Sequence, residues 1–137
     1  MPSPILKPFA DASGFVDVNK HTLQSKKFSN VFALGDCSNS PNSKTAAAVA
    51  HQNAVLANNL QSVMKKEKPT KTYQGYASCP LVTSYDRVIM AEFDYDLKPL
   101  ETFPVDQGKE RKSMFLVKKF ILPWLYWNML LKYTISS

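Results

Sequence analysis

The amino-acid sequence predicts an α/β fold on the strength of three patterns. The apolar run at residues 31–34 has the length and character of a buried strand. Residues 44–65 carry apolar side chains three and four positions apart, which is typical of a helix with one buried face. Two later apolar runs, residues 77–82 and 88–93, predict an antiparallel strand pair joined by residues 83–87.

The remaining predicted elements lie before the long helix and at its end. Pro2, Pro4 and Pro8 indicate an irregular N-terminal entry, because proline has no backbone N–H to donate. Residues 14–18 alternate apolar and polar side chains and predict a short strand. Pro69 is expected to end the long helix, because proline cannot continue the helical hydrogen bonding.

The end of the strand at residues 31–34 indicates a ligand site. Gly35 permits a tight exit from the strand and exposes Asp36, whose carboxylate can accept hydrogen bonds from sugar or polyol hydroxyls. Ser43 is expected to cap the following helix. The start of that helix, residues 44–50, would direct unpaired N–H groups and the positive end of the helix dipole toward the same crevice.

The apolar and aromatic run at residues 120–131 predicts a membrane-contact segment. It is shorter than the ~17 to 25 residues that a spanning helix needs. Pro123 is also expected to interrupt it, so an interfacial or monotopic attachment is the better prediction. Trp124, Tyr126 and Trp127 suit the headgroup level. The alternative is a C-terminal helix docked in a protein core, since aromatic clusters also form cores.

The charge pattern favours a membrane surface over nucleic acid. The formal net charge is +6, but the basic residues occur in short groups. Two of these groups, residues 109–112 and 118–119, flank the apolar run, as expected for contact with anionic lipid. No set of cysteine, histidine or carboxylate residues has the spacing of metal ligands, so no metal site is predicted.

Several motifs together resemble the mitochondrial type of sulfide:quinone oxidoreductase. They are NVFALGDCSNSPNSKTAAA at residues 30–48, YASCPLV at 76–82, AEFDY at 91–95, PLETFP at 99–104 and LYWNM at 125–129. The resemblance runs from about Asp11 to Lys132. It implies the C-terminal part of a two-dinucleotide-binding-domain flavoprotein, with an FAD-domain strand and helix, an antiparallel strand pair and C-terminal membrane-contact helices.

The resemblance also implies a division into three segments. Residues 1–68 would be the C-terminal segment of the FAD-binding domain, residues 69–108 the strand pair at the flavin and quinone site, and residues 109–137 the membrane-contact tail. The sequence has only 4 glycines and no G-x-G-x-x-G, so it cannot itself supply the pyrophosphate-binding turn of a complete dinucleotide site. The alternative is a small self-contained domain without a cofactor.

The resemblance assigns FAD to the start of the long helix. Gly35, Asp36, Lys44 and Thr45 are the expected FAD-binding residues. A lysine at a helix N-terminus opposes the dipole by a few tenths to ~1 kcal/mol, and the anionic pyrimidine end of a reduced flavin would resolve this conflict. The nearby His51 and Gln52 could line the flavin or the quinone route, although a histidine on a helix face is usually only a hydrogen-bonded side chain.

Cys79 is the expected catalytic residue. From the sequence alone, a cysteine in an apolar segment is either a reactive thiol or a small packed side chain. The resemblance places Cys79 on one of two redox-active cysteines: hydrosulfide attacks their disulfide, one cysteine carries the persulfide, and the other thiolate passes two electrons to the flavin. The second cysteine lies upstream in that family. Cys37, directly after Asp36, is predicted to be structural.

The implied function is oxidation of hydrogen sulfide to a persulfide, with electrons passing through FAD to ubiquinone. Phe93, Phe103 and Trp127 are expected to shape the quinone pocket. The expected partners are a persulfide acceptor and the mitochondrial inner membrane, with peripheral or monotopic attachment, and the chain by itself is expected to be inactive. The alternatives are a fragment like a type II NADH:quinone oxidoreductase and a catalytically inactive membrane-binding remnant.

Overall fold

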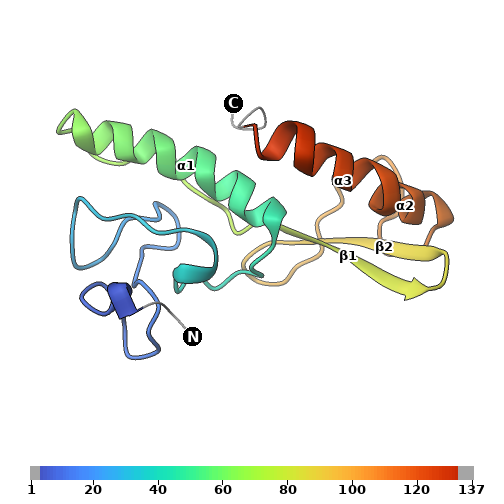
Figure 1. Ribbon diagram of the computed structural model, residues 1–137, viewed down its shortest axis with the longest axis horizontal. Helices are drawn as coiled ribbons and strands as arrows, with labels where there is room; N and C mark the ends of the chain where they lie inside the picture. The colour runs from blue at the N-terminus through green and yellow to red at the C-terminus, as the bar shows by residue number, and fades with distance from the viewer. Residues whose placement is uncertain (1–3, 133–137) are drawn as a thin grey trace.

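The computed structural model describes residues 4–132, which form two parts along the chain (Figure 1). The first part consists of loops that lie beside the long helix α1 (Ala46–Met64), and the second consists of the hairpin β1–β2 beside a C-terminal helical stretch. Residues 1–3 and 133–137 lie outside the described part, so the predicted segments 1–68 and 109–137 are described only within these limits. The three-segment division stays a prediction.

The strands predicted at residues 14–18 and 31–34 do not form as regular strands, and that prediction is wrong. Val16 forms single bridges with Ala10 and Ser38, and Phe32 forms one with Gln24. A strand becomes a ladder only where a neighbouring segment runs alongside it over several residues. Here the loops meet at single positions, and the buried side chains form a small core instead (Val16, Val18 and Ala33, with Leu6, Phe9 and Cys37 packed against it).

The long helix is confirmed, with its start two residues later than predicted. Thr45 is the N-cap, because its extended backbone lets its side-chain oxygen accept a hydrogen bond of 3.2 Å from the N–H of Ala48. The prediction that Ser43 caps this helix is therefore wrong. The helix ends at Met64, and Lys66 then adopts a left-handed conformation with φ +64°.

Two amide side chains lie buried on the inner face of α1. Asn59 is fully buried, donates to the carbonyl oxygens of Thr22 and Lys71, and accepts from the N–H of Lys71. Gln52 lies two turns earlier on the same face and accepts a hydrogen bond of 2.8 Å from the N–H of Gly35. The helix is therefore tied to the preceding and following loops by hydrogen bonds as well as by apolar contact.

The antiparallel strand pair is confirmed. Strand β1 (Ala77–Ser84) pairs with β2 (Arg87–Phe93), and the pairing becomes irregular near the turn. Ser78 lies opposite Glu92, while the next pair along, Cys79 opposite Ala91, faces the other side of the sheet because side chains alternate along a strand. The hairpin thus presents Glu92 on one face and Cys79 on the other.

The C-terminal helical stretch is continuous from residue 112 to residue 130. It consists of α2 (Lys112–Leu116), the π-helical η3 (Val117–Ile121), α3 (Leu122–Leu125) and the π-helical η4 (Tyr126–Leu130).

The prediction that Pro123 interrupts the C-terminal helical stretch is wrong. It stands in the first turn of α3, directly after the wider hydrogen-bonding turn of η3, where the missing proline N–H is tolerated. Across residues 4–132, no helix has both the length and the apolar character needed to cross a bilayer.

Candidate functional site

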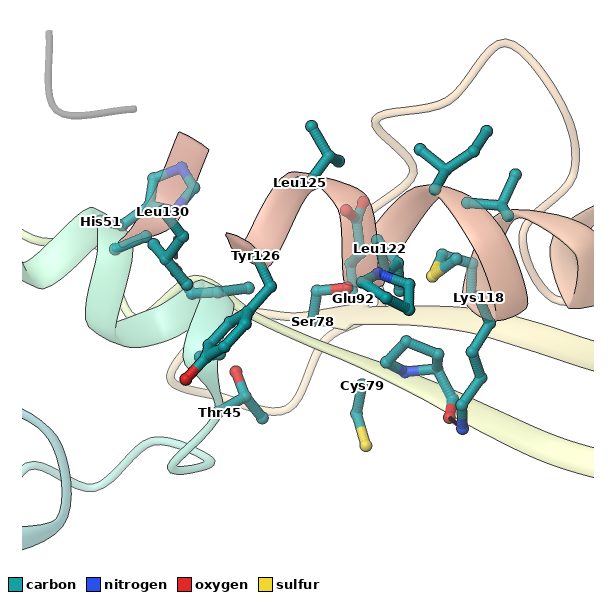
Figure 2. Close-up of a pocket in the computed structure, with 18 of the residues that line it drawn as sticks. Thr45, His51, Ser78, Cys79, Glu92, Lys118, Leu122, Leu125, Tyr126 and Leu130 are labelled. Carbon is teal, nitrogen blue, oxygen red and sulfur yellow. Dashed lines mark hydrogen bonds between the residues drawn. The ribbon is translucent and has the colours of Figure 1, made fainter. Parts of the chain in front are cut away.

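A cavity of about 840 Å³ lies between the start of α1, the hairpin and the C-terminal helical stretch (Figure 2). Its wall is mainly apolar, with a few polar side chains from each of the three elements. The polar groups come from Thr45, His51, Tyr76, Ser78, Cys79, Glu92, Lys118 and Tyr126. The cavity therefore combines an apolar surface with a small number of hydrogen-bonding groups, as ligand sites usually do.

Four of the predicted site residues meet at this cavity. Thr45 at the start of α1, Cys79 on β1, Phe103 in the loop after β2 and Trp127 on the C-terminal helical stretch all line it. These residues are far apart in the sequence, so only the fold brings them together. Phe93, the last residue of β2, does not line the cavity.

The Gly35–Asp36 loop and Lys44 lie beside the cavity without lining it. Lys44 donates hydrogen bonds to the carbonyl oxygens of Ser38 (2.7 Å), Ser40 (3.3 Å) and Gly35 (3.4 Å). Its ammonium group thus holds the loop that carries Asp36 against the start of α1. The Asp36 side chain is exposed, so a ligand can reach its carboxylate.

We expect Gly35→Ala to lower the thermal unfolding temperature of the chain. Gly35 has φ +62°, a conformation that costs a residue with a Cβ about 1–2 kcal/mol. A Cβ there would also lie 3.1 Å from Cγ2 of Val49. Gly108→Ala is the control, because Gly108 lies outside the left-handed region and its Cβ would lie 3.3 Å from the Asp106 side chain. Equal unfolding temperatures for the two variants would contradict this account.

The N-terminus of α1 faces the cavity through Thr45, Ala46 and Ala47. The helix has 19 residues. The N–H groups of its first turn have no carbonyl partner within the helix, and one of them, that of Ala48, is capped by the Thr45 side chain. These N–H groups and the helix dipole favour an electron-rich or anionic ligand group at this end of the cavity.

The two cysteines occupy different environments, and neither forms a disulfide. Cys79 is partly buried on β1, and Figure 2 shows its sulfur pointing away from Glu92 and from the C-terminal helical stretch. Cys37 packs against the small N-terminal core and donates a hydrogen bond of 3.2 Å to the carbonyl oxygen of Leu34. Cys37 therefore has the packed environment expected of a structural side chain.

Glu92 and Tyr76 are cavity residues that the sequence analysis did not identify. Glu92 is only 3% exposed. Burial alone would raise its pKa, but hydrogen bonds from Thr102, Tyr76 and Gln107 outweigh burial and hold the pKa below its ordinary value. Burial and the hydrogen bond to Glu92 raise the pKa of Tyr76 well above its ordinary value. The only signal in the sequence was one acidic residue inside the apolar run at residues 88–93.

Lys118 connects the C-terminal helical stretch to the hairpin. Its ammonium group donates a hydrogen bond of 3.0 Å to the carbonyl oxygen of Pro80 and lies on the cavity wall. The same helical stretch exposes large apolar side chains that do not line the cavity, including Leu116, Phe120 and Trp124. One side of this stretch thus closes the cavity while the other is available for an apolar contact.

Comparison with known proteins shows which proteins the chain is similar to. A Mus musculus protein is 59% identical over 125 residues, which are 91% of this chain and 28% of that protein. A Dictyostelium discoideum protein is 47% identical over 126 residues, and a Schizosaccharomyces pombe protein 47% identical over 124 residues. All three are named mitochondrial sulfide:quinone oxidoreductase. The chain is homologous to one part of the mitochondrial sulfide:quinone oxidoreductases.

The resemblance to sulfide:quinone oxidoreductase inferred from the sequence motifs is thereby confirmed, and the chain spans about 28% of the length of these relatives. Ferroptosis suppressor protein 1 of Taeniopygia guttata is 39% identical over 64 residues, 46% of this chain and 16% of that protein. No family model matches the chain.

The solved structures add a likeness in fold. A chain in the structure of the Tetrahymena thermophila mitochondrial ATP synthase F1Fo composite tetramer matches with a TM-score of 0.75. The match covers 99% of this chain and 32% of that one. At 22% sequence identity, this similarity concerns the fold alone.

Proposed function

We propose that this chain forms the C-terminal portion of a sulfide:quinone oxidoreductase. In the complete enzyme, hydrogen sulfide would be oxidised to a persulfide and the electrons would pass through FAD to ubiquinone at the mitochondrial inner membrane. The observation that carries the proposal is the shared cavity, where the Cys79 strand, the N-terminus of α1 and an aromatic helical stretch meet. The homology to proteins named sulfide:quinone oxidoreductase supports it.

The residues around the start of α1 fit one half of an FAD site. Asp36 would accept hydrogen bonds from the ribityl chain, with Gly35 and Lys44 fixing its loop, and Thr45 with the free N–H groups of α1 would receive the electron-rich pyrimidine ring. FAD, when bound, supplies a two-electron acceptor. The rest of its site would come from the remainder of the complete protein.

Cys79 would carry the sulfur chemistry. Hydrosulfide attacks the disulfide between Cys79 and a second cysteine of the complete protein, so that one new S–S bond forms and the original S–S bond breaks. One cysteine becomes a persulfide, which is transferred to an acceptor, and the other leaves as a thiolate. The hairpin places the Cys79 sulfur on the face opposite to Glu92, so sulfide and quinone would approach from different sides.

The apolar part of the cavity fits a quinone ring. Phe103 and Trp127 supply aromatic surface, and Leu122, Leu125 and Leu130 of the C-terminal helical stretch supply aliphatic surface. Because this same stretch exposes apolar side chains outward, a quinone could enter the cavity directly from the lipid phase.

The proposal is tested with a chimera in which this chain replaces the matching region of the mouse relative. We expect the chimera to bind flavin, seen in its absorbance spectrum, and to reduce decylubiquinone with sulfide but not with NADH. A flavin-loaded chimera that uses NADH instead of sulfide would favour the type II NADH:quinone oxidoreductase alternative. A flavin-loaded chimera that reduces quinone with neither donor would indicate a catalytically inactive remnant.

Membrane attachment through the C-terminal helical stretch gives a separate prediction. Phe120 and Trp124 are 59% and 57% exposed, and lysines flank them. We expect the double change Phe120→Glu, Trp124→Glu in the chimera to lower binding to phosphatidylcholine–cardiolipin vesicles about tenfold or more in a flotation assay, because buried apolar area drives interfacial binding. Met64→Glu, at an exposed position on α1, is the control. Equal binding of both variants would contradict the assignment.

A further inference from the structure

Glu92 collects hydrogen bonds from two segments that border the cavity. One carboxylate oxygen accepts from the hydroxyl of Tyr76 at 2.6 Å, in the segment that precedes β1. The other accepts from the hydroxyl of Thr102 at 2.6 Å and from the side-chain amide of Gln107 at 3.1 Å, both in the loop that follows β2. A single buried carboxylate therefore ties both segments to the open end of the hairpin, away from its turn.

The negative charge of Glu92 is stabilised by hydrogen bonds from neutral donors. Within residues 4–132, no ion pair involves Glu92, although its side chain is almost completely buried. Its hydrogen bonds keep the pKa low, so the group is ionised near neutral pH. Removing the charge, or one of its acceptor sites, would leave buried donors without partners, which is costly.

The hydrogen-bond network continues from Glu92 to an aromatic side chain on the cavity wall. Gln107 also donates to the carbonyl oxygen of Met90 at 3.0 Å, and its own side-chain oxygen accepts from the N–H of Phe103 at 3.1 Å. Phe103 lines the cavity. On the other side, the ring of Tyr76 contacts the ring of His51, with 4.4 Å between centroids. The positions of Tyr76 and Phe103 therefore both depend on Glu92.

We propose that Glu92 is a positioning residue for the quinone: through Tyr76 and Gln107 it fixes the aromatic wall against which the quinone ring packs. The inference rests on the proposed function and adds a role for a residue outside the expected FAD and cysteine chemistry. Side chains held in place before binding lower the entropy cost of ordering the site. The network therefore affects quinone affinity more than the chemical steps.

A proton-donating role is the main alternative, and the site disfavours it. Glu92 is already ionised and has no proton to give near neutral pH. Tyr76 has a raised pKa and directs its hydroxyl proton at Glu92 rather than into the cavity. Neither group is tuned toward the pH at which general acids work best.

The test uses the flavin-loaded chimera and the variants Glu92→Gln and Gln107→Leu. The amide of Glu92→Gln replaces one acceptor atom by a donor, so at least one hydrogen bond of the network is lost. Gln107→Leu leaves Glu92 in place but removes the hydrogen bond that the N–H of Phe103 donates to Gln107. We expect each variant to raise the KM for decylubiquinone about tenfold, equivalent to ~1.4 kcal/mol of binding. Sulfide-dependent bleaching of the flavin absorbance, measured without quinone, should be unchanged.

A double variant distinguishes positioning from general destabilisation. Because both residues act through one network, the double variant Glu92→Gln, Gln107→Leu should raise KM no more than about twofold beyond the larger single effect. The exposed neighbour Glu101→Gln is the matched control and should leave KM unchanged.

Three results would overturn the inference. An unchanged KM in folded Glu92→Gln or Gln107→Leu would show that the network does not set quinone affinity. Equal losses in flavin reduction by sulfide and in quinone reduction would indicate a purely structural role. A kcat effect with a shifted pH profile and unchanged KM would assign proton transfer instead. Sulfide-dependent quinone reduction by the unmutated chimera is measured first, and its absence would overturn the proposed function itself.

Discussion

Replacing Cys79 with serine is expected to lower sulfide-dependent quinone reduction by the chimera at least about 100-fold. The thiolate is the reactive form of cysteine, and a serine hydroxyl neither ionises near neutral pH nor forms a disulfide. Cys79 is a partly buried free thiol on the wall of the cavity. Serine occupies nearly the same volume at this position, so the hairpin should fold normally and the loss should reflect chemistry.

The matched control is Cys37→Ser. Serine can keep the hydrogen bond that Cys37 donates to Leu34, and the side chain packs against the N-terminal core away from the cavity wall. We expect this variant to keep nearly full activity and the same flavin content. Activity retained by Cys79→Ser, at equal flavin content, would exclude the sulfide mechanism proposed above.

The elements predicted correctly are those whose signal is local. The helix at Ala46–Met64 repeats its apolar positions over five turns, and the hairpin has two apolar runs separated by a short polar turn. The runs at residues 14–18 and 31–34 were too short to specify a partner. Their composition suits a strand, but within the described residues the loops that meet them do so only at single bridges.

Part of the candidate site could also be predicted from sequence. Thr45, Cys79, Phe103 and Trp127 were identified through motifs, and the fold brings them to one cavity. The Glu92 network could not be predicted, because its partners lie ten to sixteen residues away along the chain and only the folded hairpin and loop bring them together. A satisfied buried carboxylate can be identified only from the hydrogen-bond donors that surround it in the fold. A short sequence pattern does not contain those donors.

The start of α1 shows how the structure changes the role expected for a predicted site residue. Lys44 was expected to face an anionic flavin directly, because lysine is unfavourable at a helix N-terminus. In the structure its ammonium group is bound by three carbonyl oxygens of the Asp36 loop. The unfavourable dipole interaction is therefore offset locally, and the contribution of Lys44 to FAD binding would act mainly through the shape of this loop.

Gly75→Ala is expected to destabilise the chain by about 2–5 kcal/mol, the sum of a strained backbone and an overpacked site. Gly75 has φ +88°. A Cβ there would lie 2.4 Å from Cγ of Tyr95 and 2.6 Å from the backbone nitrogen of Tyr95. Such distances do not occur for real Cβ atoms, and a backbone atom cannot move aside without displacing its whole segment.

Tyr95 is also unable to swing away from residue 75. Its hydroxyl donates to the carbonyl oxygen of Lys20, its ring packs edge-on against Tyr73 with 5.6 Å between centroids, and the Lys20 ammonium lies 5.1 Å from its ring centre. The strain in Gly75→Ala must therefore move the segment that leads into β1.

That segment carries Tyr76 into its hydrogen bond with Glu92, so the same substitution should also raise the KM of the chimera for decylubiquinone. Chemical denaturation measures the first effect and steady-state kinetics the second, with Gly108→Ala as the control in both. A stability loss without a change in KM would show that Tyr76 keeps its position independently of the backbone at Gly75.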